Sequence, residues 1–296
     1  MMREIQIPAL DGTLLPATLF EPPDPRAAVI VSPATATPRR FYRAFCDYLA
    51  RHGAIVVTYD YRGTFEPAAQ LRSSRARMRD WGELDFAGVI EWVNARYPAL
   101  PLYAVGHSVG GHALLMTPSA AKIAGAVNVA SQSGYWRLYR GGERYRVYLF
   151  VKAIMPALTA LLGYFPGELV AFGTNLAPGV LYEWSTWCVS PGYFFDDPTM
   201  APVLANAQHL HAPVLMLGLS DDPWATPRAI EALAPAFTAA RWSFRELDPN
   251  AFGLGAVGHM GFFRSANSAL WPIVRDTLNL QGERNGHAEQ LHVHVD

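Results

Sequence analysis

The segment Gly106-His107-Ser108-Val109-Gly110 has the residue types and spacing of a nucleophilic serine on a sharp strand-to-helix turn. An apolar run at 102–105 precedes it, as a buried strand would, and a helical pattern of small residues starts at 109. Such a turn strains the serine and crowds the neighbouring backbone, so only small residues fit two positions before and after it. The alternative is a serine that merely caps a helix, but the flanking patterns favour a nucleophile, Ser108.

A serine hydroxyl needs a base within hydrogen-bond reach and an acid that orients the base. Of the nine histidines, His259 is the one in a glycine-flanked loop after the last predicted strand, although an ordinary loop histidine is the alternative. Asp221 and Asp222 follow an apolar run at 214–217, at the strand end where open α/β sheets place their chemistry. Adjacent side chains cannot both point at the base. The Asp-Pro spacing favours Asp222, which leaves Asp221 as a loop-capping carboxylate.

An acyl-transfer site also needs two backbone N–H groups that point at the developing oxyanion. The first expected donor is the N–H of Val109, directly after the nucleophile. The second should come from the loop after the strand at 27–31, where Pro33 has no N–H to offer. Ala34 or Thr35 must therefore donate, and Ala34 is the preferred candidate.

These residues require a scaffold of alternating strands and helices. Residues 5–7 and 14–20 are predicted to form an opening antiparallel pair around the turn Asp11-Gly12. Further buried strands are expected at 27–31, 54–59, 102–105, 123–129, 214–217 and 242–247, and helices at 41–51, 78–97, 109–116, 227–237 and 265–278. Continuous apolar strands separated by helices indicate an α/β fold with a mostly parallel, doubly wound sheet buried on both faces.

Residues 132–200 interrupt this alternation and are about twice as aromatic as the rest of the chain, with 15 Trp, Tyr and Phe residues in 69 positions. We expect a helical cap here, which either simply covers the sheet or also lines an apolar substrate pocket. The predicted division is a core of residues 1–131 and 201–280, a cap of residues 132–200, and a flexible polar tail over 281–296.

Composition excludes several classes of function. The 296 residues carry a formal net charge of −1, so no nucleic-acid partner is expected. Four arginines between positions 72 and 79 are best explained as a solvated loop and helix start, with an anion site as the alternative. No cofactor is expected, because no phosphate loop or dinucleotide fingerprint is present, and no metal, because the two His-x-His pairs lack partners at ligand spacing.

The cysteine content also indicates that the protein belongs to a reducing compartment. Cys46 and Cys188 are expected to be buried free thiols, although a single disulfide is the alternative. No signal peptide is visible at the N-terminus. The most apolar stretch, 147–165, contains Lys152, Pro156 and Gly163, so its uninterrupted part is predicted to be too short for stable membrane insertion. A cytoplasmic location follows as an expectation.

Taken with its motifs, the chain resembles the α/β-hydrolase superfamily over nearly its full length, and most closely a poorly characterised group of bacterial predicted serine hydrolases. The motifs that carry this resemblance are Arg40-Phe41-Tyr42-Arg43, Tyr59-Asp60-Tyr61-Arg62-Gly63, Arg79-Asp80-Trp81-Gly82, Gly106-His107-Ser108-Val109-Gly110-Gly111, Ser133-Gly134-Tyr135-Trp136, Gly163-Tyr164-Phe165-Pro166 and Gly258-His259-Met260-Gly261-Phe262-Phe263. The resemblance implies a triad of Ser108, Asp222 and His259 and a helical cap between the sixth and seventh strands. One departure is Ser32-Pro33, where many members have His-Gly in the oxyanion loop.

The sequence thus favours an esterase-like serine hydrolase that acts on a small-molecule substrate with an apolar acyl or aromatic group. The same residues would also serve an acyltransferase or an amidase. A protein of different class, a non-catalytic binding protein on this scaffold, is the remaining alternative.

Overall fold

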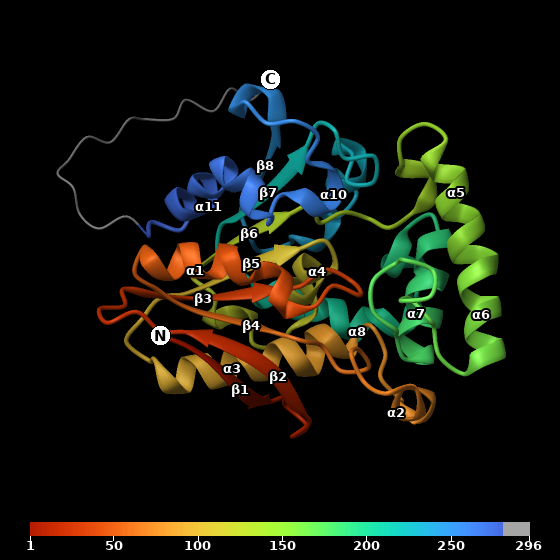
Figure 1. Cartoon of the computed structure of the whole chain (residues 1–296), viewed down its shortest axis with the longest axis horizontal. Coiled ribbons are helices and arrows are strands. Elements are labelled where there is room, and N and C mark those ends of the chain that lie inside the picture. Colours follow the sequence, from red (N-terminus) through yellow and green to blue (C-terminus); the bar gives the residue numbers. More distant parts are fainter. Residues whose placement is uncertain (281–296) are drawn as a thin grey trace.

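A single eight-stranded sheet runs through the protein (Figure 1), in the strand order β1-β2-β4-β3-β5-β6-β7-β8. The computed structural model describes residues 1–280, and the tail predicted over 281–296 lies outside the described residues. The strands are β1 (Met2–Pro8), β2 (Leu14–Phe20), β3 (Ala27–Ser32), β4 (Ala54–Tyr59), β5 (Leu102–His107), β6 (Gly125–Val129), β7 (Val214–Leu219) and β8 (Trp242–Leu247). Pairing is antiparallel from β1 to β2 and from β2 to β4, and parallel elsewhere. The predicted doubly wound, mostly parallel α/β-hydrolase fold is therefore confirmed.

Helices cover both faces of this sheet, with α1 and α11 on one side and α3 on the other (Figure 1). Every residue of β3 and β4 is buried, as their unbroken apolar runs require of central parallel strands. The α-helices are α1 (Arg43–Arg51), α2 (Ala68–Ser73), α3 (Ala87–Arg96), α4 (Val109–Met116), α5 (Glu143–Leu149), α6 (Met155–Leu162), α7 (Pro178–Val189), α8 (Ala201–Leu204), α9 (Pro227–Glu231), α10 (Gly258–Gly261) and α11 (Trp271–Thr277). Cys46 and Cys188 are both buried and unpaired, as expected.

Two predicted helices are divided into separate segments, and proline explains both divisions. The helix expected over 227–237 ends at Glu231, and a separate 3₁₀ turn, Ala234–Ala236, contains Pro235. The helix expected over 265–278 divides at residue 270, where α11 starts with Pro272 in its first turn. Proline lacks the N–H of a helix interior and fits only the first turn, so each one begins a new segment.

The segment after β6 forms one long helix, against the expectation that its apolar stretch is broken. Helix α5, the π-helical turn Phe150–Ile154 and α6 run on continuously over Glu143–Leu162, with Pro156 in the first turn of α6. By length and composition this 20-residue helix could cross a membrane, with a mean hydropathy of 1.4, and only 17% of its apolar window is buried. It lies at the outer edge of the molecule, beyond α7 (Figure 1).

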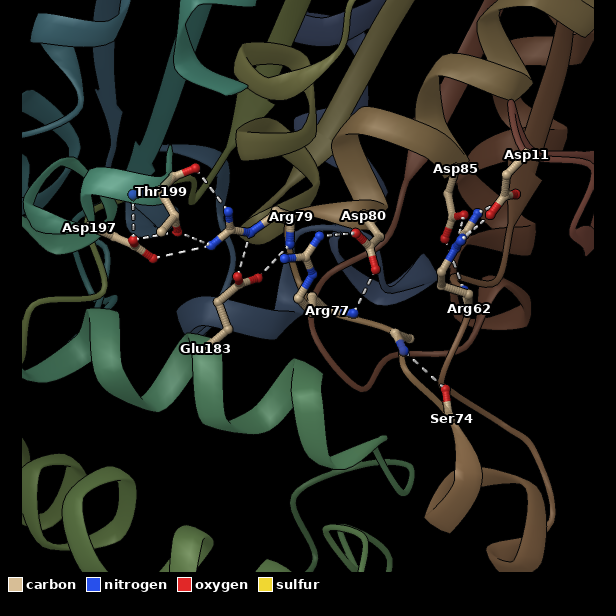
Figure 2. Close-up of polar contacts among 11 residues, drawn as sticks. Asp11, Arg62, Ser74, Arg77, Arg79, Asp80, Asp85, Glu183, Asp197 and Thr199 are labelled. Carbon is tan, nitrogen blue, oxygen red and sulfur yellow. Dashed lines mark hydrogen bonds and ion pairs between the residues drawn. The ribbon is translucent and has the colours of Figure 1, made fainter. Parts of the chain in front are cut away.

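Arg79 ties the sheet domain to the segment that contains α7. Its backbone N–H and its Nε donate to the Glu183 carboxylate at 2.8 and 2.5 Å, and its terminal nitrogens reach the Thr199 carbonyl at 2.9 Å and Asp197 at 3.2 Å (Figure 2). Only 8% of the Arg79 side chain and 9% of the Glu183 side chain are exposed. The expectation that all four arginines of 72–79 are solvated is therefore wrong for Arg79.

Candidate active site

Ser108 occupies the sharp turn that joins β5 to α4, with the left-handed backbone angles φ 52° and ψ −118°. A Cβ added to Gly106 would lie 2.5 Å from the Cα of Gly111, and one added to Gly110 would lie 2.2 Å from the carbonyl oxygen of Ser32. Both distances are below any real contact, so the two glycines are required by close backbone approach, as predicted. The strained serine persists because the surrounding structure fixes it.

His259 lies next to the Ser108 hydroxyl, at the edge of the sheet where the parallel strands end. Its Nε2 is 3.2 Å from Ser108 Oγ, and its Nδ1 is 2.7 Å from Asp222 Oδ2. A carboxylate can only accept, so the Nδ1–H donates to Asp222 and the neutral ring presents an unprotonated Nε2 to the serine. The structure thus brings Ser108, His259 and Asp222 together from three loops that are far apart in sequence.

Asp222 is fully buried and is held as an anion by its partners. Its Oδ1 accepts the backbone N–H groups of Trp224 and Ala225 at 2.8 and 3.1 Å, while Oδ2 faces His259. Burial alone would raise the pKa of this carboxyl, but His259 and the two N–H donors outweigh burial and hold the pKa below its ordinary value. An ionised carboxylate here can fix the imidazole tautomer and stabilise an imidazolium.

Asp221, the adjacent carboxylate, points elsewhere. Its Oδ2 accepts the backbone N–H groups of Val257 and Gly258 at 2.7 and 3.0 Å. Gly258 directly precedes His259 and adopts a positive φ of 59°. Asp221 therefore caps the segment that presents His259, as the sequence indicated for whichever aspartate did not face the base.

The two expected oxyanion donors differ in availability. The N–H of Val109 is the first of helix α4 and has no intrahelical acceptor, so it remains available next to Ser108. The N–H of Ala34 donates to the Tyr42 hydroxyl at 2.8 Å, in a buried position. The preference for Ala34 therefore needs correction, because its N–H is already engaged. Within residues 1–280 the N–H of Thr35, the other candidate, has no intramolecular acceptor.

His107 and Tyr42 connect these parts of the site, a role that the sequence did not reveal. Tyr42 accepts the Ala34 N–H and bonds His107 Nδ1 at 2.7 Å, while His107 Nε2 donates to the backbone carbonyl of His259 at 3.0 Å. Burial, together with the nearby His259, lowers the pKa of His107 to about 3, so its ring is neutral. The sequence suggested only packing for His107. Tyr42 carried a weak signal, as part of the motif Arg40-Phe41-Tyr42-Arg43.

A cavity of about 250 Å³ lies over Ser108. Its lining includes Thr35, Val109 and His259. Aromatic side chains of the 132–200 segment also line it, among them Phe172 and Trp184. A small molecule that reaches the serine must therefore contact both parts of the chain.

Across residues 1–280, no group of three or more His, Cys, Asp and Glu side chains is arranged to hold a metal ion.

A family model described as serine aminopeptidase, S33, matches residues 23–165, a range that includes Ser108 but neither Asp222 nor His259. No curated protein matches the chain. Solved structures do match at low identity. An esterase from Pyrococcus furiosus has a TM-score of 0.59 at 13% identity, with 94% of this chain and 90% of that chain covered.

Two further structures widen the comparison. A thermostable carboxyl esterase from Bacillus coagulans has a TM-score of 0.52 at 15% identity, covering 83% of this chain and 90% of that chain. A bromoperoxidase from Bacillus anthracis has a TM-score of 0.55 at 14% identity, covering 94% of this chain and 100% of that chain. The match to the family model and the likeness of the fold both support the α/β-hydrolase superfamily. At these identities the structures establish the fold, which hosts several chemistries.

Proposed function

We propose that the protein is a serine esterase in which Ser108 is the nucleophile, His259 the general base and acid, and Asp222 the residue that orients His259. The observation that carries this proposal is the pair of distances from His259, 3.2 Å to Ser108 Oγ and 2.7 Å to Asp222 Oδ2. Both are within the reach that nucleophile activation requires. The esterases among the structurally similar proteins are consistent with it.

In the first half of the reaction, His259 Nε2 removes the hydroxyl proton while Ser108 Oγ attacks the acyl carbonyl of an ester. The carbonyl oxygen becomes an oxyanion, which the N–H groups of Val109 and Thr35 stabilise. The ester C–O bond then breaks, and the alcohol leaves with the proton from His259.

In the second half, water attacks the acyl-enzyme and gives a proton to His259 Nε2. The bond from the acyl carbon to Ser108 Oγ breaks, the carboxylic acid leaves, and Ser108 regains its proton from His259. Asp222 stays ionised throughout and stabilises the imidazolium that forms in each half.

We further propose that residues 132–200 act as a cap on a core of residues 1–131 and 201–280. The Ser108 cavity draws side chains from both parts, and the cap side contributes Tyr139, Phe172 and Trp184. Aromatic walls favour an apolar group on the substrate.

The test is covalent labelling with a fluorophosphonate probe, which reacts with an activated serine. The wild-type protein should be labelled, Ser108→Ala should not, and Ser73→Ala, a change at an exposed helix serine, should label like the wild type. Folded wild-type protein that stays unlabelled, or Ser108→Ala labelled to the same extent, would overturn the proposal. The first result would instead favour a binding protein on this scaffold.

A further inference from the structure

A second cavity, of about 490 Å³, lies against the inner side of the long helix Glu143–Leu162. It shares part of its wall with the cavity over Ser108, and the shared side chains are Tyr139, Ala171, Phe172, Trp184 and Trp224. The two spaces therefore adjoin, with these five residues between and around them. A substrate whose ester group sits at Ser108 would reach the second cavity by passing between these side chains.

The side chains that line the second cavity are mostly apolar and favour a hydrocarbon group. The long helix contributes Val147, Leu149, Phe150, Val151 and Ile154, and the opposite wall includes Val170, Phe172 and Trp184. Cys188 also lines it, and burial raises the pKa of its thiol, so the sulfur is uncharged there.

The charged side chains of this lining are Glu143 and Arg146, which form an ion pair. Arg146 donates to Glu143 Oε2 at 3.0 Å, and Trp224 Nε1 donates to Glu143 Oε1 at 3.0 Å. Both carboxylate oxygens are thus already engaged within the protein. The Arg146 side chain is 82% exposed, so its remaining donors face solvent, and an alkyl chain along the apolar part of the lining needs no polar partner.

The cavity is also elongated. Its lining residues on the helix run from position 143 to 154, which at 1.5 Å per residue corresponds to roughly 16 Å along the helix axis. The inner cavity is half as large and suits a short acyl group. A chain of medium length would fill both.

We infer that the substrate carries an unbranched apolar chain of the octanoyl to dodecanoyl class, which lies in this second cavity beneath the helix Glu143–Leu162. This inference rests on the proposed esterase function of Ser108. It names the substrate class and assigns the helix to substrate binding.

The experiment measures kcat/KM for two series of esters, p-nitrophenyl acyl esters from acetate to dodecanoate and acetate esters of alcohols of matching length. For the wild type, kcat/KM should rise with length in one series, by about threefold to fourfold per methylene buried. Activity on acetate with a flat or falling profile in both series would overturn the inference while leaving the esterase proposal standing.

Two variants fill the second cavity from opposite walls, Val147→Trp on the helix and Val170→Trp facing it. Each should lower kcat/KM for the favoured long ester at least about tenfold more than for the acetate, because a bulky ring displaces two or more methylenes. Leu161→Trp is the matched control, since Leu161 is on the same helix but is 80% exposed and outside the cavity lining. Equal losses on short and long esters in both filling variants would count against the inference.

A binding measurement tests the hydrocarbon site independently of the proposed esterase activity. A fluorescent fatty acid, 11-(dansylamino)undecanoic acid, should bind Ser108→Ala, and adding Val147→Trp should raise Kd at least about tenfold while adding Leu161→Trp leaves it within about twofold. If no ester is hydrolysed but this pattern of binding is seen, the esterase proposal fails and the hydrocarbon site stands. If the probe does not bind, or binds all three proteins equally, the hydrocarbon site is refuted.

Discussion

Replacement of Arg79 by methionine should destabilise the protein far more than a typical surface change. The substitution keeps an unbranched side chain and the backbone N–H that donates to Glu183, but it removes every side-chain donor to Glu183, Asp197 and Thr199 (Figure 2). Glu183 would keep a buried carboxylate without its cation. Because breaking a buried ion pair from one side costs about 3–5 kcal/mol, we expect the free energy of unfolding to fall by about that amount.

The expected loss of unfolding free energy is large because of the Glu183 carboxylate. Burial raises the pKa of its carboxyl above the ordinary value even though Arg79 provides a backbone N–H, a guanidinium bond and a nearby charge. Without the Arg79 guanidinium, the backbone N–H of residue 79 and the more distant Arg77 are left to offset the burial of the anion. The double variant Arg79→Met with Glu183→Met removes both charges together and should recover most of the loss, since matched apolar pairs often replace buried ion pairs at little cost.

Arg77→Met is the matched control, two residues away in the same segment. Arg77 approaches Asp80 at 3.5 Å and is 53% exposed, so its loss should cost less than about 1 kcal/mol. Urea denaturation followed by tryptophan fluorescence gives the free energy of unfolding of the wild type, the two single variants and the double variant. In a thermal melt, Tm should fall by roughly 6–10 °C for Arg79→Met. If Arg79→Met costs no more than Arg77→Met, or if the double variant is no more stable than the single one, the reasoning is wrong.

Three further predictions follow from the site. Asp222→Asn should lower kcat for ester hydrolysis by about 10,000-fold, because the wrong imidazole tautomer is favoured, whereas Asp221→Asn retains an oxygen acceptor for the loop and should lower kcat by less than about tenfold; equal losses would contradict the assigned roles. The pKa of His107 is lowered to about 3 in the folded protein, so below about pH 6.5 the unfolded state binds a proton that the folded state does not, and stability should fall with pH by about 2 kcal/mol at pH 5; urea titrations at several pH values should show a shallower decline in His107→Gln. Gly106→Ala should abolish folded, active protein, since its Cβ would meet backbone at 2.5 Å, while Gly255→Ala, with nothing within 4 Å, should leave the thermal transition and activity unchanged.

Much of the fold could be predicted because its signals are local. Buried parallel strands have continuous apolar runs, and the turn around Ser108 needs glycine at two fixed positions. The helix boundaries were predicted less well. Pro235 and Pro272 start new segments that helical periodicity alone does not separate, and Pro156 does the opposite by fitting into a continuous helix. A proline predicts a boundary only when the register of the preceding turn is known.

The details of the site could not be predicted because they depend on contacts between distant segments. The N–H of Ala34 is engaged because Tyr42, eight residues later, places its hydroxyl between that N–H and His107. No spacing in the sequence reports this. By composition Arg79 is likewise one of four arginines in a polar segment, yet its partners Glu183 and Thr199 are more than a hundred positions away.

The choice of Asp222 over Asp221 could be made from residue order and spacing along the chain, whereas the choice of Ala34 as an N–H donor could not. Both aspartates follow β7, and both bond to the segment that contains His259, one through backbone N–H groups and the other through the imidazole. Together they fix the position and the tautomer of the same ring. The Ala34-Tyr42-His107 chain reaches that segment from the opposite side, at the His259 carbonyl. His259 is therefore held by side chain and backbone at once, so that in the proposed reaction the strained Ser108 would meet a preorganised Nε2.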